Sequence, residues 1–174
     1  MNDAVFIGLV VGVISLAGCE KKNDTTTSPA ARAADTLSSF PVLQPAVVAY
    51  VHGDKSTAVS NFLAVDWSIR PLFAPGSALN LGESQFHALA ESDYHARSYE
   101  LTGQLLTLKA LASTVAEAGF VAARNSDTAQ ARKCFMSLKQ FGTALDSTNY
   151  MLIIQLVGRG YEKMSDTGMA KMAQ

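Results

Sequence analysis

The sequence predicts an all-α protein, a small helical bundle built from antiparallel helical hairpins. Two observations on residue spacing carry this prediction. Apolar and small residues recur at alternating spacings of four and three in the segment 94–124, and again in the segment 131–145. This is the period of a helix face that packs on a neighbouring helix. A short polar turn at Asn125 to Asp127 joins the two segments, so we expect them to fold back on each other.

Length and charge limit the classes of function. A chain of 174 residues suits one domain with a proper core. The formal charge is −1, and the Lys and Arg residues form no cluster. Because a nucleic-acid-binding protein needs a basic face for the phosphates, we expect no nucleic-acid partner.

The N-terminus carries the most specific motif in the chain. The apolar stretch from Ala4 to Leu16 is shorter than the about 20 residues that span a membrane, and it fits the core of a signal peptide. It ends in the sequence Leu16-Ala17-Gly18-Cys19. These four residues resemble the lipobox of bacterial lipoproteins, L-[AS]-[GA]-C, at every position.

The resemblance implies how this protein is processed and where it resides. In that family the cysteine thiol receives a diacylglyceryl group, and the signal peptidase cuts just before it. Residues 1–18 would then be a cleaved signal peptide, and Cys19 the lipidation site that binds the bilayer through its acyl chains, palmitate among them. Glu20 is not the aspartate that retains such proteins in the inner membrane, so the resemblance favours the outer membrane. The domain would face the periplasm.

One feature departs from the lipoprotein pattern. Residues 1–3 contain no Lys or Arg, whereas the family has a positive segment there. Either the true start lies upstream or the signal is weak. The alternative is a buried apolar strand or helix that ends in an ordinary cysteine. We favour the signal peptide because a polar tract follows.

The composition of that polar tract predicts a flexible tether between the anchor and the domain. The segment 20–36, "EKKNDTTTSPAARAADT", holds no large apolar side chain, so it cannot bury enough surface to offset its ordering entropy. We therefore expect residues 19–39 to be the lipidated cysteine and a flexible tether. As a coil, such a segment spans roughly 25 Å on average.

The helical domain is expected at residues 40–165 and begins with two short helices. Pro45 suits the first turn of a helix over 44–52, which Gly53 closes. Asp54 is expected to cap the second helix. One face of that second helix holds Ala58, Phe62 and Val65.

A loop and the longest helix follow. Pro71, Pro75 and Gly76 predict a loop over 68–82, and a short helix is expected after Ser84. Ser92 or Asp93 is expected to cap the helix over 94–124. Its predicted seam is Leu101, Leu105, Leu108, Ala112, Val115, Gly119 and Ala122.

Two further helices complete the domain. The first has a seam of the same period, formed by Ala131, Phe135, Leu138, Gly142 and Leu145. The last helix is expected over 150–164, with residues 166–174 as a frayed tail. It is expected to bury Leu152, Ile153, Leu156, Val157 and Met164.

A partial repeat accompanies these helices. An aspartate, an alanine four residues on and a phenylalanine four further occur at Asp54, Ala58 and Phe62, and again at Asp127, Ala131 and Phe135. This pattern resembles the second helix of a tetratricopeptide repeat. The resemblance implies pairs of helices stacked with a small residue against an aromatic one. The offset of the copies is not a multiple of that repeat's length, and a plain helical bundle with the same spacing is the favoured alternative.

The sequence offers few candidate metal-binding or catalytic residues. His87, Glu91 and His95 would share one face of a continuous helix, and two His with a carboxylate can hold zinc. A cap at Ser92 and Asp93 would separate them, so we treat a metal site there as the lesser alternative and expect no cofactor. Cys134 lies on a predicted core face, which favours a buried, inert thiol.

We therefore expect a non-enzymatic envelope lipoprotein whose helical domain binds another protein or a copy of itself. The alternative is a periplasmic helical domain that binds a small ligand or metal through the His87, Glu91 and His95 set.

Overall fold

The computed structural model describes residues 39–172, and this part of the chain contains six α-helices, one short 3₁₀ helix and no β-strand. The predicted all-α fold is confirmed. The predicted signal peptide, Cys19 and nearly all of the tether lie outside the described residues. The elements are α2 (Gln44–Val51), α3 (Lys55–Leu63), η1 (Ala78–Asn80), α4 (Glu83–His87), α5 (Glu91–Arg124), α6 (Thr128–Leu145) and α7 (Leu152–Met172).

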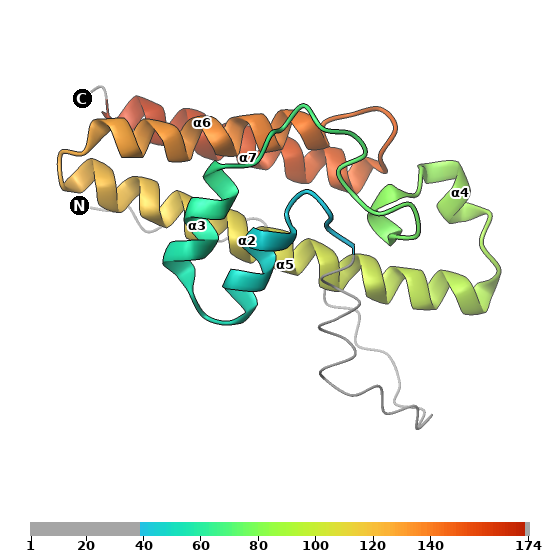
Figure 1. The fold of residues 1–174 in the computed structure, drawn as a ribbon. Helices are drawn as coiled ribbons and strands as arrows, with labels where there is room; N and C mark the ends of the chain where they lie inside the picture. Colours follow the sequence, from blue (N-terminus) through green and yellow to red (C-terminus); the bar gives the residue numbers. More distant parts are fainter. Residues whose placement is uncertain (1–38, 173–174) are drawn as a thin grey trace, which may run out of the picture.

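Three long helices form the body of the domain (Figure 1). Helix α6 runs back along α5, and α7 turns again to run along α6, so neighbours in the sequence pack antiparallel. The short α2–α3 hairpin packs across α5 and α6, and α4 lies near the first turns of α5. The predicted bundle of helical hairpins is therefore present in the described residues.

The α2–α3 hairpin follows its sequence signals closely. Pro45 occupies the first turn of α2, and Gly53 adopts the left-handed φ of +81° that closes the turn. The Asp54 carboxylate accepts a hydrogen bond from the Thr57 amide at 2.9 Å and caps α3. Helix α3 ends at Leu63, so Val65 packs on the core from the loop beyond it.

Helix α5 begins earlier than predicted. Ala90, in extended conformation, is the residue before the helix, and Glu91 is its first residue. The expected cap at Ser92 or Asp93 is therefore wrong. Glu91 and Asp93 instead lie in the first turn, where carboxylates interact favourably with the helix dipole.

The predicted seam of α5 is confirmed. Its members from Leu108 onward are buried, and Leu101 and Leu105 are partly buried against the same core. Among the described helices α5 alone is long and apolar enough to cross a membrane, by length and composition. Because 44% of its most apolar window is buried inside the bundle, it reads more simply as a core helix.

Helix α6 buries the whole of its predicted seam. All five members from Ala131 to Leu145 are buried, and Cys134, Ser137 and Phe141 join them. The turn before it places Ser126 at a φ of 61°, and Asp127 accepts a hydrogen bond from the Gln130 amide at 3.0 Å. The antiparallel α5–α6 hairpin is thus confirmed.

Helix α7 differs from the prediction in its length and in its buried face. It runs to Met172, so residues 166–172 are helical and the predicted frayed tail is wrong. Leu152, Ile153 and Leu156 are 57%, 48% and 53% exposed. Val157 and Met164 are only partly buried. The buried face instead consists of Ile154, Gly158, Tyr161, Ser165 and Gly168.

Close approach of α6 and α7 is the physical reason for this face. A Cβ atom built on Gly142 would lie 2.5 Å from the Gly158 carbonyl oxygen, and one on Gly158 would lie 2.6 Å from the Gly142 carbonyl oxygen. Only residues without a side chain fit between the two backbones. Ser165 adds a hydrogen bond from its hydroxyl to the Phe135 carbonyl at 2.6 Å. The larger apolar residues of α7 are left outside this contact.

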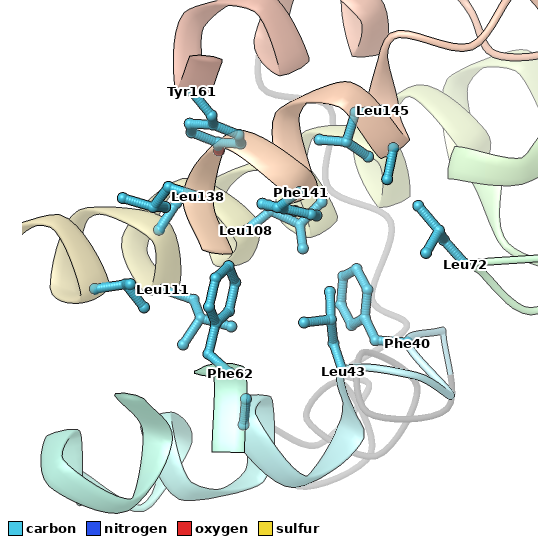
Figure 2. Packing of buried hydrophobic residues seen from close by; sticks show 14 of the residues in the cluster. Phe40, Leu43, Phe62, Leu72, Leu108, Leu111, Leu138, Phe141, Leu145 and Tyr161 are labelled. Carbon is cyan, nitrogen blue, oxygen red and sulfur yellow. The ribbon is translucent and has the colours of Figure 1, made fainter. Parts of the chain in front are cut away.

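Aromatic rings fill the junction between α3 and α6 (Figure 2). The Phe62 ring lies 4.9 Å from that of Trp67 and 5.5 Å from that of Phe141, centroid to centroid. Tyr161 stacks on the other side of Phe141 at 5.3 Å. Such rings bury large apolar areas and orient one another, so they fix the α2–α3 hairpin on the bundle.

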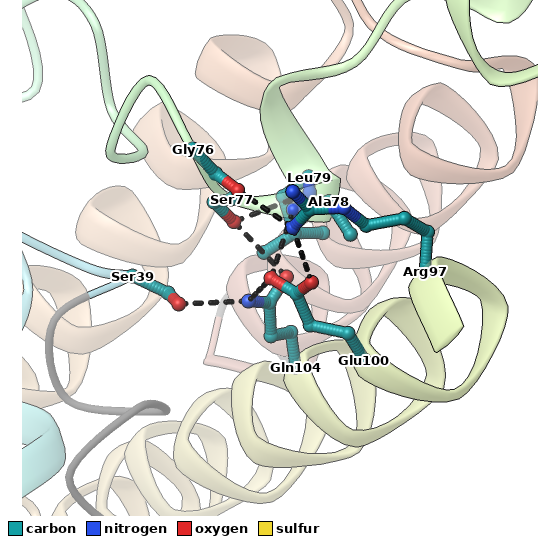
Figure 3. Close-up of polar contacts among 8 residues, drawn as sticks. All are labelled: Ser39, Gly76, Ser77, Ala78, Leu79, Arg97, Glu100 and Gln104. Atoms are coloured by element: carbon teal, nitrogen blue, oxygen red, sulfur yellow. Dashed lines mark hydrogen bonds and ion pairs between the residues drawn. The ribbon is translucent and has the colours of Figure 1, made fainter. Parts of the chain in front are cut away.

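A buried polar cluster fixes the start of the domain and the loop before η1 onto α5 (Figure 3). The Gln104 amide donates to the Ser39 hydroxyl at 2.8 Å and accepts from the Ser77 hydroxyl at 3.0 Å. The Glu100 carboxylate accepts from the Ala78 amide at 3.0 Å and from Arg97 at 2.6 Å. A buried glutamine is stable here because both ends of its amide are satisfied.

Candidate functional site

The structure does not bring the three metal candidates together. His87 ends α4, whereas Glu91 and His95 lie in the first turns of α5 beyond the break at 88–90. The His87 imidazole instead contacts the Glu83 carboxylate at 3.1 Å. Within residues 39–172, no group of three His, Cys, Asp or Glu side chains could hold a metal ion. The predicted break is real, but it falls before Glu91 rather than after it.

Cys134 lies in the core between α5 and α6. The thiol is fully buried, and the adjacent Gly119 of α5 leaves room for it. Burial raises the pKa of the Cys134 thiol, and the charge of Asp127 raises it further. Because the nucleophile would be the thiolate, this environment disfavours covalent chemistry at Cys134.

A hollow lies between the loop after α3 and the outer side of α6. Its volume is about 480 Å³. Its walls combine apolar side chains with two cations, one carboxylate, one amide and two hydroxyls: Val65, Asp66, Trp67, Ser68, Arg70, Lys139, Gln140, Thr143 and Ala144.

Hydrogen bonds hold the loop side of this hollow in place. The Trp67 indole donates to the Ser137 hydroxyl of α6 at 3.1 Å. The Asp66 carboxylate accepts from the Ser68 hydroxyl at 2.6 Å and from the Ser68 amide at 2.9 Å. These two bonds lower the pKa of Asp66. The wall is therefore a fixed surface rather than a loose segment.

A second, smaller hollow lies on the other side of Arg70. Its volume is about 380 Å³. It is formed where the loop meets the turn between α6 and α7, and its walls are Arg70, Pro71, Asn80, Ser147, Asn149 and Tyr150. Because Arg70 lines both hollows, we call the two together the Arg70 furrow.

Arg70 differs from the other cation of the furrow. Lys139 pairs with Asp166 at 2.8 Å, which raises the pKa of the lysine. The ion pairs among residues 39–172 do not include Arg70. Its Nη1 donates instead to the carbonyl oxygens of Trp67 and Ile69, at 2.7 and 2.8 Å. The arginine is thus held in place by backbone oxygens while its charge stays unneutralised.

The outer side of α7 carries a second notable surface. Leu152, Ile153 and Leu156 are about half exposed and lie within two turns of the helix. Single exposed apolar residues are common, but three neighbours on one helix form a small apolar patch.

Comparison with known proteins finds no relative of this chain. No family model matches it, and neither a curated protein nor a solved structure is similar to it. The candidate site therefore rests on the geometry alone. The sequence reasoning missed the Arg70 furrow, although the length of the loop over 68–82 was a signal for it, because long ordered loops are frequently functional.

Proposed function

We propose that this protein is a lipid-anchored lipoprotein of the cell envelope, held in the outer membrane through Cys19. Its helical domain, on the periplasmic side, binds a partner protein and is not an enzyme. The lipobox at Leu16 to Cys19 and the polar tract after it support the anchor. No described group of acid, base and nucleophile favours catalysis.

The Arg70 furrow is the observation that carries the interaction role. It lies where the loop after α3 meets α6 and the α6–α7 turn, combines apolar walls with polar groups, and is large enough for several side chains. A bundle with such a groove suits a bound segment of another protein. The apolar patch on α7 supports a second contact, with the same partner or with another copy of the chain.

The anchor is tested by Cys19→Ser. We expect this change to abolish lipid labelling in cells and to leave an uncleaved precursor, because the chemistry needs the thiol. Unchanged attachment of the variant to membranes would contradict the anchor.

The interaction role is tested by capture from intact envelopes. Protein starting near Ala33 should fold and capture its partner. Gln140→Trp would fill the larger hollow and should reduce capture, whereas Lys133→Trp, exposed on the same helix away from the furrow, should not. Equal capture by both variants would show that the furrow is not the contact surface.

The absence of catalysis is tested separately. We expect no turnover of generic ester, peptide or glycoside substrates. Robust turnover that disappears on changing His87, His95 or Cys134 would favour an enzyme.

A further inference from the structure

We propose that the smaller hollow beside Arg70 is a carboxylate-binding site. It takes an acidic side chain from an extended segment of the partner protein. This inference rests on the proposed interaction function and names the chemistry of the partner.

The walls of the hollow supply donors and no acid. Beside Arg70 stand the amides of Asn80 and Asn149 and the hydroxyls of Ser147 and Tyr150, with no carboxylate among the lining residues. The nearest carboxylate along the chain, Asp146, is held by Arg159 at 3.1 Å. An anion entering the hollow therefore meets one positive charge and several hydrogen-bond donors, and no carboxylate lines the hollow.

The geometry of Arg70 favours a planar anion. Its Nη1 hydrogens are directed to the carbonyl oxygens of Trp67 and Ile69. The Nε and Nη2 hydrogens remain, and together they form the side-on fork that pairs with both oxygens of a carboxylate. A guanidinium fixed in advance loses less side-chain entropy when it binds.

The two asparagines add unpaired donors. Neither carboxamide makes a hydrogen bond with another side chain of the described residues, and Asn80 is only partly exposed. Arg70 lies close enough to Tyr150 for its charge to act on the phenol. Burial raises the pKa of Tyr150, while the Leu72 amide and Arg70 oppose that rise. The phenol therefore stays protonated and can donate a hydrogen bond at neutral pH.

The charge of the site and its surroundings indicate the source of the carboxylate. A single cation matches a monoanion better than a phosphate dianion, which recruits clusters of arginines. The larger hollow continues from Arg70 to Trp67 and Ala144, so residues flanking the acid have apolar walls to lie against. An extended peptide segment can use both hollows, whereas a small organic acid would use only one.

The test is a titration of the full chain in detergent, followed by the fluorescence of Trp67, the single tryptophan, which lines the larger hollow. The probes are the peptides Ac-Ala-Ala-Glu-Ala-Ala-NH2 and the same peptide with Gln in place of Glu. We expect saturable binding of the Glu peptide, about tenfold tighter than the Gln peptide and weakened by salt. Equal binding of both peptides would overturn the inference.

A charge variant sharpens the test without disturbing Arg70. Asn149→Asp places an acid in the hollow at an exposed position, so the fold should persist. It should lower affinity for the Glu peptide about tenfold through repulsion between like charges. Asn125→Asp, which makes the same change of charge at the exposed end of α5, should have no effect. Equal affinities in the two variants would contradict the site.

Three further outcomes separate the possible failures. Binding of free glutarate without binding of the Glu peptide would overturn the peptide source of the carboxylate. A second outcome is that Gln140→Trp abolishes envelope capture while the Glu and Gln peptides bind with equal affinity. This result would overturn the carboxylate site but would still support the interaction role. Absence of capture by every variant would remove the interaction role itself.

Discussion

Helices α3 and α6 carry the same short pattern in different surroundings. In each, an aspartate caps the helix, an alanine four residues on is fully buried, and a phenylalanine four further is fully buried. In α3 the phenylalanine, Phe62, meets the rings of Trp67 and Phe141. In α6 the phenylalanine, Phe135, lies against Gly119 and Gly168 and contacts the ring of Phe120.

The two helices show what the local sequence determines and what the tertiary packing determines. The pattern specifies where the helix starts and which two residues face inward, and both copies obey it. The neighbours around each ring are set by other parts of the chain: the rings of Trp67 and Phe141 around Phe62, and two glycines with the ring of Phe120 around Phe135. The tetratricopeptide resemblance of this pattern stays a prediction.

The largest expected effect comes from removing either ring. Phe135→Ala and Phe62→Ala should each lower the free energy of unfolding by about 3–5 kcal/mol, since both leave a cavity in the core. Trp67 fluorescence distinguishes the pattern in α3 from the pattern in α6. Phe62→Ala should shift the emission of the folded protein, because the two rings touch, whereas Phe135→Ala should not. An unchanged melting temperature in Phe135→Ala would show that its seam is misplaced.

Adding a methyl group at Gly168, beside Phe135, should have the next largest effect. A Cβ on Gly168 would overlap the Phe135 ring, so Gly168→Ala should cost about 1–3 kcal/mol by overpacking. Gly160→Ala, in the same helix with open space around it, should stabilise by about 0.5–1 kcal/mol. Phe135→Leu should relieve part of the cost of Gly168→Ala in a double-mutant cycle. Additive effects would contradict the contact.

Tyr161→Phe should have a smaller effect, on the Phe62 side of the core. The Tyr161 hydroxyl is the one buried side-chain polar atom without a hydrogen-bond partner among residues 39–172. Its removal should stabilise the fold by up to about 1 kcal/mol, because an unsatisfied buried donor carries a desolvation cost. Chemical denaturation measures this change, and a clear loss of stability would indicate an unseen partner for the hydroxyl.

Tyr161 should also make the stability of the fold depend on pH. Burial raises the pKa of Tyr161 in the folded state, so above the ordinary pKa of tyrosine the unfolded chain ionises first. Stability should therefore fall as the pH rises through that range, and the fall should be shallower in Tyr161→Phe. Parallel pH profiles for the two proteins would contradict this assignment.

The smallest effect concerns the cap of α3. Hydrogen bonds from Thr57 lower the pKa of the exposed Asp54 in the folded state. Stability from this group is therefore present above the ordinary pKa of aspartate and is lost as the pH falls through the folded value. Asp54→Asn keeps a capping oxygen without a titrating group, so its melting temperature should fall less in acid than that of the original protein.

Much of the fold could be predicted because its signals are local. The caps at Asp54 and Asp127, the turn at Gly53 and the seams of α5 and α6 depend on residues within a few turns of one another. Hydrophobic period and capping chemistry act at that range. The predicted start of α5 is wrong because Ser92 and Asp93 are good caps in isolation, whereas the helix already begins after Ala90.

The sequence by itself determined the all-α class, the order of the helices and the inward faces of α5 and α6. The resemblance to a lipobox at Cys19 rests likewise on sequence alone, and it stays a prediction. Only the tertiary structure decided the face of α7, because backbone contact between Gly142 and Gly158 outweighs the burial of three larger residues. It also decided the Arg70 furrow, whose walls come from a loop, a helix and a turn distant in the chain. No local sequence pattern specifies the furrow, because its walls come together only when helices that have already formed pack on one another.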